Sequence, residues 1–461
     1  MSTFSGLNTA YSGLAAARAG LDVTAQNIAN ATTQGYTRQR LETSSAAPLR
    51  QTLFSTGIHA GEGVLAQGVA RLGDAHLEAR VRVTAGAAGY TAVRAQAFSA
   101  LEDGLKEPSA NGISTSLQNF WAGWQELSNA AEQDAPASSL LSAAGELTGR
   151  IAAGFRDVEA QWATVRSSAE GLTGEVNQAA AQVAELNRQI RSAVASGTSA
   201  NELVDRRTTL TATLAGLTGA AVRESADGTV DVVLAGDPLV SGTTARELRV
   251  AGPSQLGDPG AVTVEWAHRP GASAGVESGE LAATLSLLAP ADAGGPLAQT
   301  ATGYNAFATQ LAGQVNALHT GAGKGAFFAL DPGRAAASLT VLPTRREDLA
   351  TGAPGAGAFD GSVAAGISGL GIGRQSPDAT WSAFVADLGA AARAELQGNA
   401  LAEVSATTAL QQHLGATSVS MDEEQVRLLE YQHAYQGAAR VMTAVDEMLD
   451  VLINRMGIVG R

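Results

Sequence analysis

The residues of this sequence that could do chemistry are few, and a glycine–lysine pair at residues 323–324 is the first to consider. It lies in "HTGAGKGAFF", residues 319–328, and is similar to a phosphate-binding loop, whose backbone N–H groups and lysine surround a nucleotide phosphate. That loop needs a Ser or Thr after the lysine to bind magnesium, and another glycine upstream. Gly325 and Leu318 occupy these two positions. The pattern therefore predicts no nucleotide site.

The remaining candidate groups also lack the spacing that a site requires. "GLGIGR", residues 369–374, has neither the preceding strand nor the full spacing of a dinucleotide-binding loop. An acidic group near the C-terminus, residues 446–450, is typical of a solvated helix face. The histidines are scattered and none is spaced as a metal-ligand pair: His59, His76, His268, His319, His413 and His433. We predict no catalytic residue, no metal and no cofactor, and a protein that is not an enzyme.

The informative residues are instead apolar, and they require a helix at each end of the chain. Near the N-terminus they are spaced alternately by three and four, which is typical of a helical heptad seam. Its members are Phe4, Leu7, Tyr11, Leu14, Arg18, Leu21, Ala25 and Ile28, of which Arg18 is the one polar interruption. Near the C-terminus the same spacing covers Leu428, Tyr431, Tyr435, Ala438, Met442, Val445, Leu449, Leu452, Met456 and Val459.

Polar residues mark where these two helices end and begin. The segment from Asn27 to Arg40 is predicted to end the first helix and to lead the chain into the rest of the protein. Asn30 is expected in the left-handed region at the helix end, Gly35 permits a positive φ in the turn, and Tyr36 packs back on the helix. Ser420 precedes Glu423 by three residues, which predicts an N-cap for the second helix.

A narrow apolar seam is not stable in water alone. Burying one leucine stabilises by about 1.5–3 kcal/mol, so each seam is expected to find a partner. One interpretation is that both helices pack on the protein's own core. The other is that the two ends pair with each other and with further copies of the chain.

Both ends resemble the bacterial flagellar axial proteins. "SGLNTAYSGLAAARAGLDVTAQNIANATTQGYTRQ" is similar to their N-terminal signature, and "MDEEQVRLLEYQHAYQGAARVMTAVDEMLDVLINRMG" to their C-terminal one. Thr-Arg-Gln after Gly-Tyr resembles the hook-associated members, because rod and hook subunits usually have Gly-Phe there. The resemblance continues in "VAELNRQIRSAVASGTSANELVDRRTTLTATLAGL" and "LAGQVNALHTGAGKGAFF".

The resemblance implies a function, a location and partners. It implies a structural adapter at the junction of hook and filament, exported by the flagellar type III system and assembled as a ring through its terminal helices. The implied partners are the hook protein, the next hook-associated protein and a cytoplasmic export chaperone at the C-terminal helix. Two alternatives stay open: a hook or rod subunit, and a surface adhesin that acts through the β-rich insertion described below.

The chain between the ends is mostly helical, with one change of period. Residues 70–220 predict long helices, in which Leu117, Phe120, Trp121, Trp124 and Leu127 form a row expected in the core. From about residue 221 the pattern alternates around an Asp-Gly turn at 227–228, a hairpin signal. The predicted fold class is mainly α with an inserted β-rich domain, a helical-bundle body, and terminal helices that pair as a coiled coil.

Three domains are expected from these patterns. Residues 1–60 with 419–461 form the terminal coiled-coil domain, residues 61–220 with 291–418 the helical body, and residues 221–290 the β-rich outer domain. A hairpin and loops are expected at about 325–376, within the body.

Composition limits the remaining possibilities. The chain has 461 residues, of which 45% are hydrophobic, so it can bury a core. A formal net charge of −14 argues against nucleic acid or an anionic membrane as a partner. There are no cysteines, and neither a Sec signal peptide nor a long apolar run is apparent. We expect a secreted protein without membrane insertion.

Overall fold

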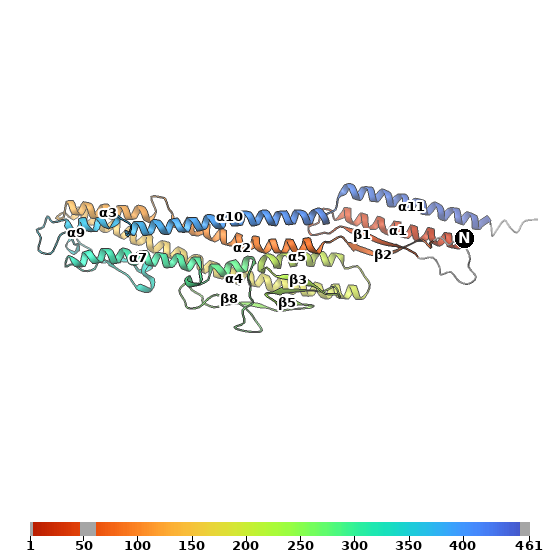
Figure 1. The fold of residues 1–461 in the computed structure, drawn as a ribbon, viewed down its shortest axis with the longest axis horizontal. Coiled ribbons are helices and arrows are strands. Elements are labelled where there is room, and N and C mark those ends of the chain that lie inside the picture. The colour runs from red at the N-terminus through yellow and green to blue at the C-terminus, as the bar shows by residue number, and fades with distance from the viewer. Residues whose placement is uncertain (1–2, 47–60, 452–461) are drawn as a thin grey trace, which may run out of the picture.

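The computed structural model describes residues 3–46 and 61–451, which form an elongated, mainly helical molecule (Figure 1). The first and last helices, α1 (Thr3–Ala29) and α11 (Met421–Asp450), lie side by side at one end. Ser420 caps α11, since its side chain accepts a hydrogen bond from the backbone N–H of Glu423, which confirms the predicted N-cap. The predicted fold class, helical with an inserted β-rich region, is also confirmed.

Two strands complete this end of the molecule. β1 (Gln39–Ser45) and β2 (Val64–Arg71) pair antiparallel, from Gln39 opposite Arg71 to Ser45 opposite Val64. The hairpin runs along α1, where the backbone N–H of Val64 donates to Ser12 Oγ at 3.3 Å. We call α1, α11, β1 and β2 the terminal unit, and residues 75–417 the body.

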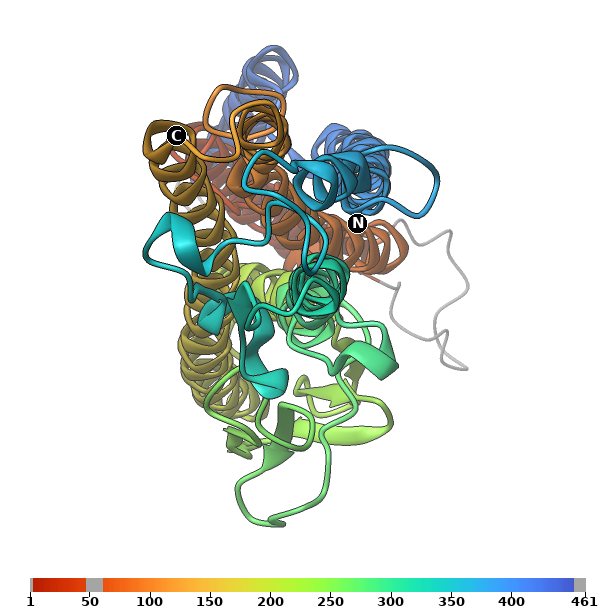
Figure 2. The same ribbon diagram turned by 90° about the vertical axis from the view of Figure 1, so that its left-hand side faces the viewer.

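Long helices build the body. α4 alone has 62 residues and runs through it, and α10 lies along α2 (Figures 1 and 2). Asp74 caps α2 by accepting hydrogen bonds from the backbone N–H groups of His76 and Leu77. The body helices are α2 (Ala75–Leu105), α3 (Ile113–Asn129), α4 (Asp134–Ala195), α5 (Asn201–Thr218), α6 (Gly279–Leu287), α7 (Pro296–Gly321), α8 (Ala335–Ser338), α9 (Ser362–Ser368) and α10 (Pro377–Thr417).

The inserted strands lie on one side of α4 (Figure 2). They form a four-stranded sheet in the order β3–β4–β5–β6 and a separate β7–β8 pair. The predicted hairpin at residues 227–228 is confirmed, and Asn187 of α4 ties it down by hydrogen bonds to both backbone groups of Val230. The strands are β3 (Ala221–Glu224), β4 (Val230–Leu234), β5 (Asp237–Ser241), β6 (Thr244–Ala245), β7 (Leu248–Ala251) and β8 (Thr263–Trp266), with a further pair, β9 (Phe328–Ala329) and β10 (Thr340–Val341), in the body.

The hydrophobic core belongs to the body. The aromatic row on α3 is buried as predicted, and Phe120 and Trp124 pack against Phe327. Among the described residues, the continuous core begins at Ala97 and ends at Ala392, so it contains no residue of the terminal unit. The terminal unit is therefore attached to the body by hydrogen bonds and ion pairs and not by the continuous core.

Candidate functional site

The two terminal helices are antiparallel and keep one register along their length. A Cβ added at Gly6 would lie 3.8 Å from a Val445 methyl, and one at Gly13 would lie 3.9 Å from the Cβ of Ala438. At Gly20 it would overlap the ring of Tyr431. Each step of seven residues along α1 thus matches a step of seven back along α11, as in a coiled coil.

Small residues make this contact, and the sequence analysis did not single them out. Ala10 and Ala17 are buried between the three glycines, and the buried Thr24 follows the last of them, so the row that faces α11 is spaced by three and four. The signal was present in the heptad spacing of the glycines. It was missed because leucines dominate a search for apolar seams, whereas small residues let two helices approach closely.

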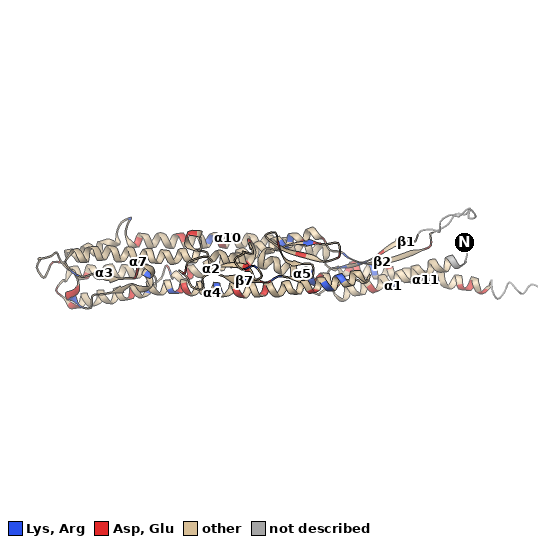
Figure 3. Ribbon diagram, turned by 90° about the horizontal axis from the view of Figure 1, so that it is seen from below, with Lys and Arg blue, Asp and Glu red and all other residues tan. Residues whose placement is uncertain are grey.

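The predicted seam on α1 lies beside this contact. Leu7, Leu14, Leu21 and Ile28 each follow a residue of the contact row and are half-buried. Ser12, which binds the β1–β2 hairpin, projects to the opposite side of α1. The leucines therefore line the side of α1 that the hairpin leaves uncovered. α1 carries only two charged residues, Arg18 and Asp22. Arg18 interrupts the row of leucines, and the rest of this side is apolar (Figure 3).

The residues of the predicted seam on α11 differ in burial, and one of them contacts α1 directly. Val445 is buried against α1. Leu428, Met442 and Leu449 are half-buried, Tyr435 is exposed, and Leu452 lies outside the described residues.

Asn27, the last member of the α1 contact row, forms the polar end of the helix pair. Its amide donates to the backbone oxygen of Gln39 at 2.8 Å and to Glu424 Oε2 at 3.1 Å. Its oxygen accepts from the Tyr36 hydroxyl at 2.8 Å and from the backbone N–H of Gln39 at 2.9 Å. All four hydrogen-bonding positions of this buried amide are occupied, so Asn27 joins α1, β1, α11 and the turn.

The turn after α1 brings Tyr36 back to that amide. Gly35 has φ 79°, a value that favours glycine, and it sits against Thr209 of α5. Burial raises the pKa of Tyr36 to about 12, and the nearby carboxylates of Asp205, Glu202 and Glu424 add to the shift. The phenol therefore stays protonated and donates its hydrogen bond.

The expectation for Asn30 was wrong. Outside glycine, positive φ occurs among the described residues at Lys106 and Ala235, so Asn30 is not left-handed. Its amide donates to the backbone oxygen of Gln26, and its oxygen accepts from the hydroxyl of Thr33. The side chain itself thus satisfies the end of the helix, and no left-handed residue is needed.

Arg38 joins the terminal unit to both chain segments that lead into the body. Its Nε lies 2.7 Å from Glu424, whose side chain is fully buried, and its Nη1 lies 2.5 Å from the exposed Glu423. Its backbone N–H donates to Thr417 at the end of α10, and its carbonyl accepts from Leu72 before α2. One residue therefore holds the two links side by side.

A second set of charges lies on the body side of the joint. Asp205 of α5 accepts from the backbone N–H of Thr37 at 3.0 Å and from Arg71 Nε at 2.6 Å. Arg71 also binds Glu78 of α2 at 2.8 Å. The buried carboxylate of Asp205 therefore fixes the turn after α1 to α5, and each of its two oxygens accepts a hydrogen bond.

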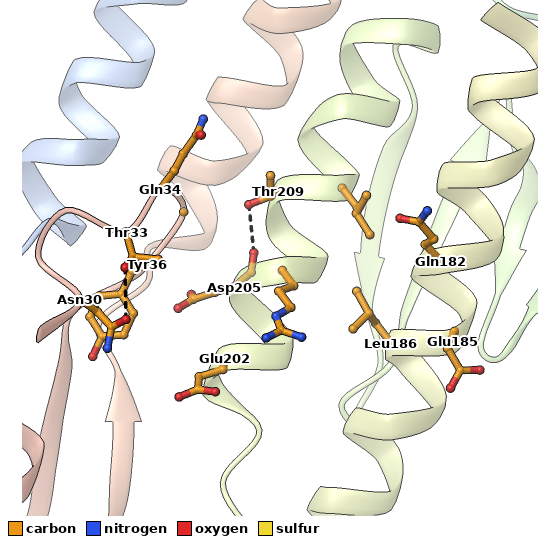
Figure 4. A pocket seen from close by; sticks show the side chains of 13 residues that line it. Asn30, Thr33, Gln34, Tyr36, Gln182, Glu185, Leu186, Glu202, Asp205 and Thr209 are labelled. Atoms are coloured by element: carbon orange, nitrogen blue, oxygen red, sulfur yellow. Dashed lines mark hydrogen bonds between the residues drawn. The ribbon is translucent and has the colours of Figure 1, made fainter. Parts of the chain in front are cut away.

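A cavity of about 680 Å³ opens next to this joint (Figure 4). The turn at residues 30–36 forms one wall, and α4 and α5 form the other, with Leu186 and Glu202 among the lining residues.

The groups that might have done chemistry are held in structural roles. Lys324 Nζ donates to the backbone oxygen of Glu347, and His319 is buried between Gly325 and Ala350 with a hydrogen bond at each ring nitrogen. Within residues 3–46 and 61–451, no cluster of three His, Cys, Asp or Glu side chains could hold a metal ion. No helix in this part of the chain is long and apolar enough to cross a membrane.

Family models match the ends and the body separately. The model described as the helical domain of flagellar hook-associated protein FlgK matches residues 98–325. A flagella basal body rod protein model matches residues 7–37, and one for the C-terminal part of the basal body rod FlgEFG proteins matches residues 410–456. The two end matches fall on α1 and α11.

The proteins of similar sequence described next are all named flagellar hook-associated protein 1. The chain is 27% identical to flagellar hook-associated protein 1 of Bacillus subtilis, over the full length of both chains. It is 33% identical to the protein of that name from Salmonella typhimurium, over 56% of this chain and 46% of the relative, and 32% identical to that of Escherichia coli. Its fold is similar to the flagellar hook junction protein FlgK from Burkholderia pseudomallei, with a TM-score of 0.64 and 15% identity over 74% of this chain and all of the solved one.

Proposed function

Since the chain belongs to the family of flagellar hook-associated protein 1, we propose that it is the structural adapter at the hook–filament junction. In this role it assembles as a ring through its terminal helices and contacts the hook protein and the next hook-associated protein. The relatives are flagellar structural components, so the prediction that the chain is not an enzyme is confirmed. The observation that carries the proposal is the apolar side of α1, left open beside a helix pair that is already formed.

The predicted seam is the proposed surface for assembly. The antiparallel contact with α11 is made by the small residues of α1, so the leucines of α1 stay available for another contact. Four half-buried side chains at heptad spacing offer a continuous row to a neighbouring copy. Each would add about 1 kcal/mol or more when its remaining surface is covered. We propose that the first segment of this terminal domain extends to about residue 72 instead of residue 60, because β2 pairs with β1.

We also propose the route by which the protein reaches the junction. It leaves the cell through the flagellar type III channel, and a cytoplasmic chaperone covers the C-terminal helix before export. Several large apolar side chains on α11 are exposed in the single chain, including Val426, Leu429, Val441 and Met448. Surface of this kind favours aggregation unless a partner covers it.

A deletion strain tests the function. Cells that lack this protein should make hooks without filaments, and flagellin should appear in the culture medium as monomer. Electron microscopy of the cells and immunoblotting of the medium measure both results. Full-length filaments on the mutant would contradict the proposal, and missing hooks would indicate a rod or hook subunit instead.

Complementation of the same strain tests the assembly surface. Leu14→Asp places a charge in the proposed seam and should abolish filaments, because burying an unpaired carboxylate costs several kcal/mol per copy. The neighbouring Ala15 is exposed, so Ala15→Asp is the matched control and should restore filaments. Both purified variants should keep the circular dichroism of the wild type. Normal filaments with Leu14→Asp would rule out this side of α1 as the contact.

A further inference from the structure

The joint contains a half-buried histidine with one ring nitrogen shut off from solvent. His413 lies on α10 between Ala409 and Thr417, which are both buried and each four residues away, so the three share the face of α10 that packs on α2. Its Nδ1 is buried and forms no hydrogen bond with any group in the described ranges. A buried N–H without an acceptor loses its hydration and gains nothing in return. The site therefore fits a neutral imidazole whose proton is on Nε2.

The charged groups around this ring act on it in opposite directions. Burial lowers the pKa of His413, the carboxylates of Glu78 and Asp74 oppose this shift, and the guanidinium groups of Arg71 and Arg82 add to it. Glu78 is itself buried and already lies 2.8 Å from Arg71 and 3.8 Å from Arg82. A second proton on the ring would therefore lie near two arginines, and the one buried carboxylate among these four groups is already paired.

Two further charged or titratable residues at the start of α2 complete this neighbourhood. His76 and Arg80 are both exposed. Arg80 Nη1 donates to the side-chain oxygen of Gln412 on α10 at 2.6 Å, which holds the two helices together next to the histidine. His413 therefore lies where α10 meets the start of α2, shortly before the linker of residues 418–420 that leads to the terminal unit.

Hydrogen bonds at the end of α10 connect this histidine to Arg38. The carbonyl of His413 accepts a hydrogen bond from the Thr417 hydroxyl at 2.8 Å, and the carbonyl of Thr417 accepts one from the backbone N–H of Arg38 at 2.9 Å. The side chain of Arg38 is paired with Glu423 and Glu424 of α11. A movement of the last turn of α10 is therefore transmitted directly to the terminal unit.

We propose that His413 is an acid-sensitive latch of the joint: when its ring takes up a second proton from solvent, the last turn of α10 separates from α2 and the terminal unit loosens. The protonated ring carries an N–H at Nδ1, which must leave its buried position to reach water. A histidine freed from α2 titrates near pH 6.5, whereas the packed ring resists the proton. The stabilisation is therefore complete above about pH 6.5 and is lost as the pH falls below that value.

Hydrogen exchange of the purified full-length protein tests the latch. From about pH 7.5 to about pH 5, after correction for intrinsic rates, the amides of residues 410–417, Arg38 and Leu72 should exchange at least about threefold faster. His413→Leu has a similar volume and no titratable group, so it should abolish this acceleration. His76→Gln removes the exposed histidine of the same neighbourhood and should retain it. Equal acceleration in the wild type and His413→Leu, or slower exchange of the wild type in acid, overturns the proposal.

Nuclear magnetic resonance of the imidazole gives a second readout, which does not depend on the stability of the variants. At about pH 7.5 the His413 ring should carry its proton on Nε2 and none on Nδ1, and it should titrate below about pH 6.5. A proton on Nδ1 at that pH, or titration at or above about pH 6.5, overturns the proposal. Both experiments use the purified chain, so they are independent of the deletion strain. Only the consequence for the cell rests on the proposed function: outside the cell, the joint would respond to the pH of the medium.

Discussion

At the scale of single residues, the joint depends on side chains that satisfy several partners at once. Asn27 is buried with four hydrogen bonds, and Glu424 is buried between Asn27 and Arg38. Removing one partner from such a group costs more than the hydrogen bond itself, because the others lose their solvation without compensation. These residues are therefore expected to control the stability of the terminal unit.

Two adjacent glutamates allow this expectation to be measured. Glu424→Ala leaves Arg38 with a buried, partly unpaired charge and should destabilise the terminal unit by about 3–5 kcal/mol. Glu423 pairs with the same arginine from an exposed position, so Glu423→Ala should cost about 0–1 kcal/mol. Hydrogen exchange of the α1 and α11 amides gives both values. Equal effects would show that burial at residue 424 is unimportant.

Tyr36 makes a contribution that depends on pH. A free tyrosine has a pKa near 10, whereas that of Tyr36 is about 12. Between these values the unfolded chain has released a proton that the folded chain keeps, so this contribution is complete below pH 10 and falls as the pH rises toward 12. Tyr36→Phe should lose about 0.5–1.5 kcal/mol at pH 8. The difference in stability between wild type and variant should shrink from pH 10 to 12 in denaturant unfolding, and a constant difference would contradict the assignment.

At the scale of elements, the glycines of α1 set how close α11 can come. Gly20→Ala places a methyl group against the Tyr431 ring, and the overpacking should cost about 1–3 kcal/mol. Gly437 on α11 has no neighbour within 4 Å of an added Cβ. Gly437→Ala should therefore stabilise, by about 0.5–1 kcal/mol from helix propensity. Hydrogen exchange of the α11 amides should be faster than in the wild type with Gly20→Ala and slower with Gly437→Ala. Stabilisation by both changes would argue against the close contact.

Local signals in the sequence were sufficient for some elements and not for others. Ser420 as N-cap, the hairpin at residues 227–228 and the aromatic row of α3 each follow from a few neighbouring residues. The contact face of α1 does not, because two parallel rows share its heptad spacing and the more apolar one is not the one that meets α11. The pair Asn27–Glu424 spans 397 positions, so no local pattern contains it.

At the scale of the whole molecule, the body should fold without the terminal unit. Its continuous core contains no residue of α1 or α11, so residues 72–418 produced alone are expected to keep the melting temperature of the full chain within a few degrees. All five tryptophans, Trp121, Trp124, Trp162, Trp266 and Trp381, lie in the body, so their fluorescence reports its unfolding alone. A fragment that melts far below the full chain would show that the terminal unit supports the core.

The two links that Arg38 holds side by side have a mechanical consequence. A joint made of one strand of chain swivels freely about its own axis. Here two linkers connect the terminal unit to the body: Leu72–Asp74 and Ser418–Ser420. Arg38 holds them together through two backbone hydrogen bonds, and rotation would have to break both because it separates the linkers. Bending away from α5 is opposed in turn by the hydrogen bond from the backbone N–H of Thr37 to Asp205. The joint is therefore held against rotation by Arg38 and against bending by Asp205, so the terminal unit keeps one orientation relative to the body.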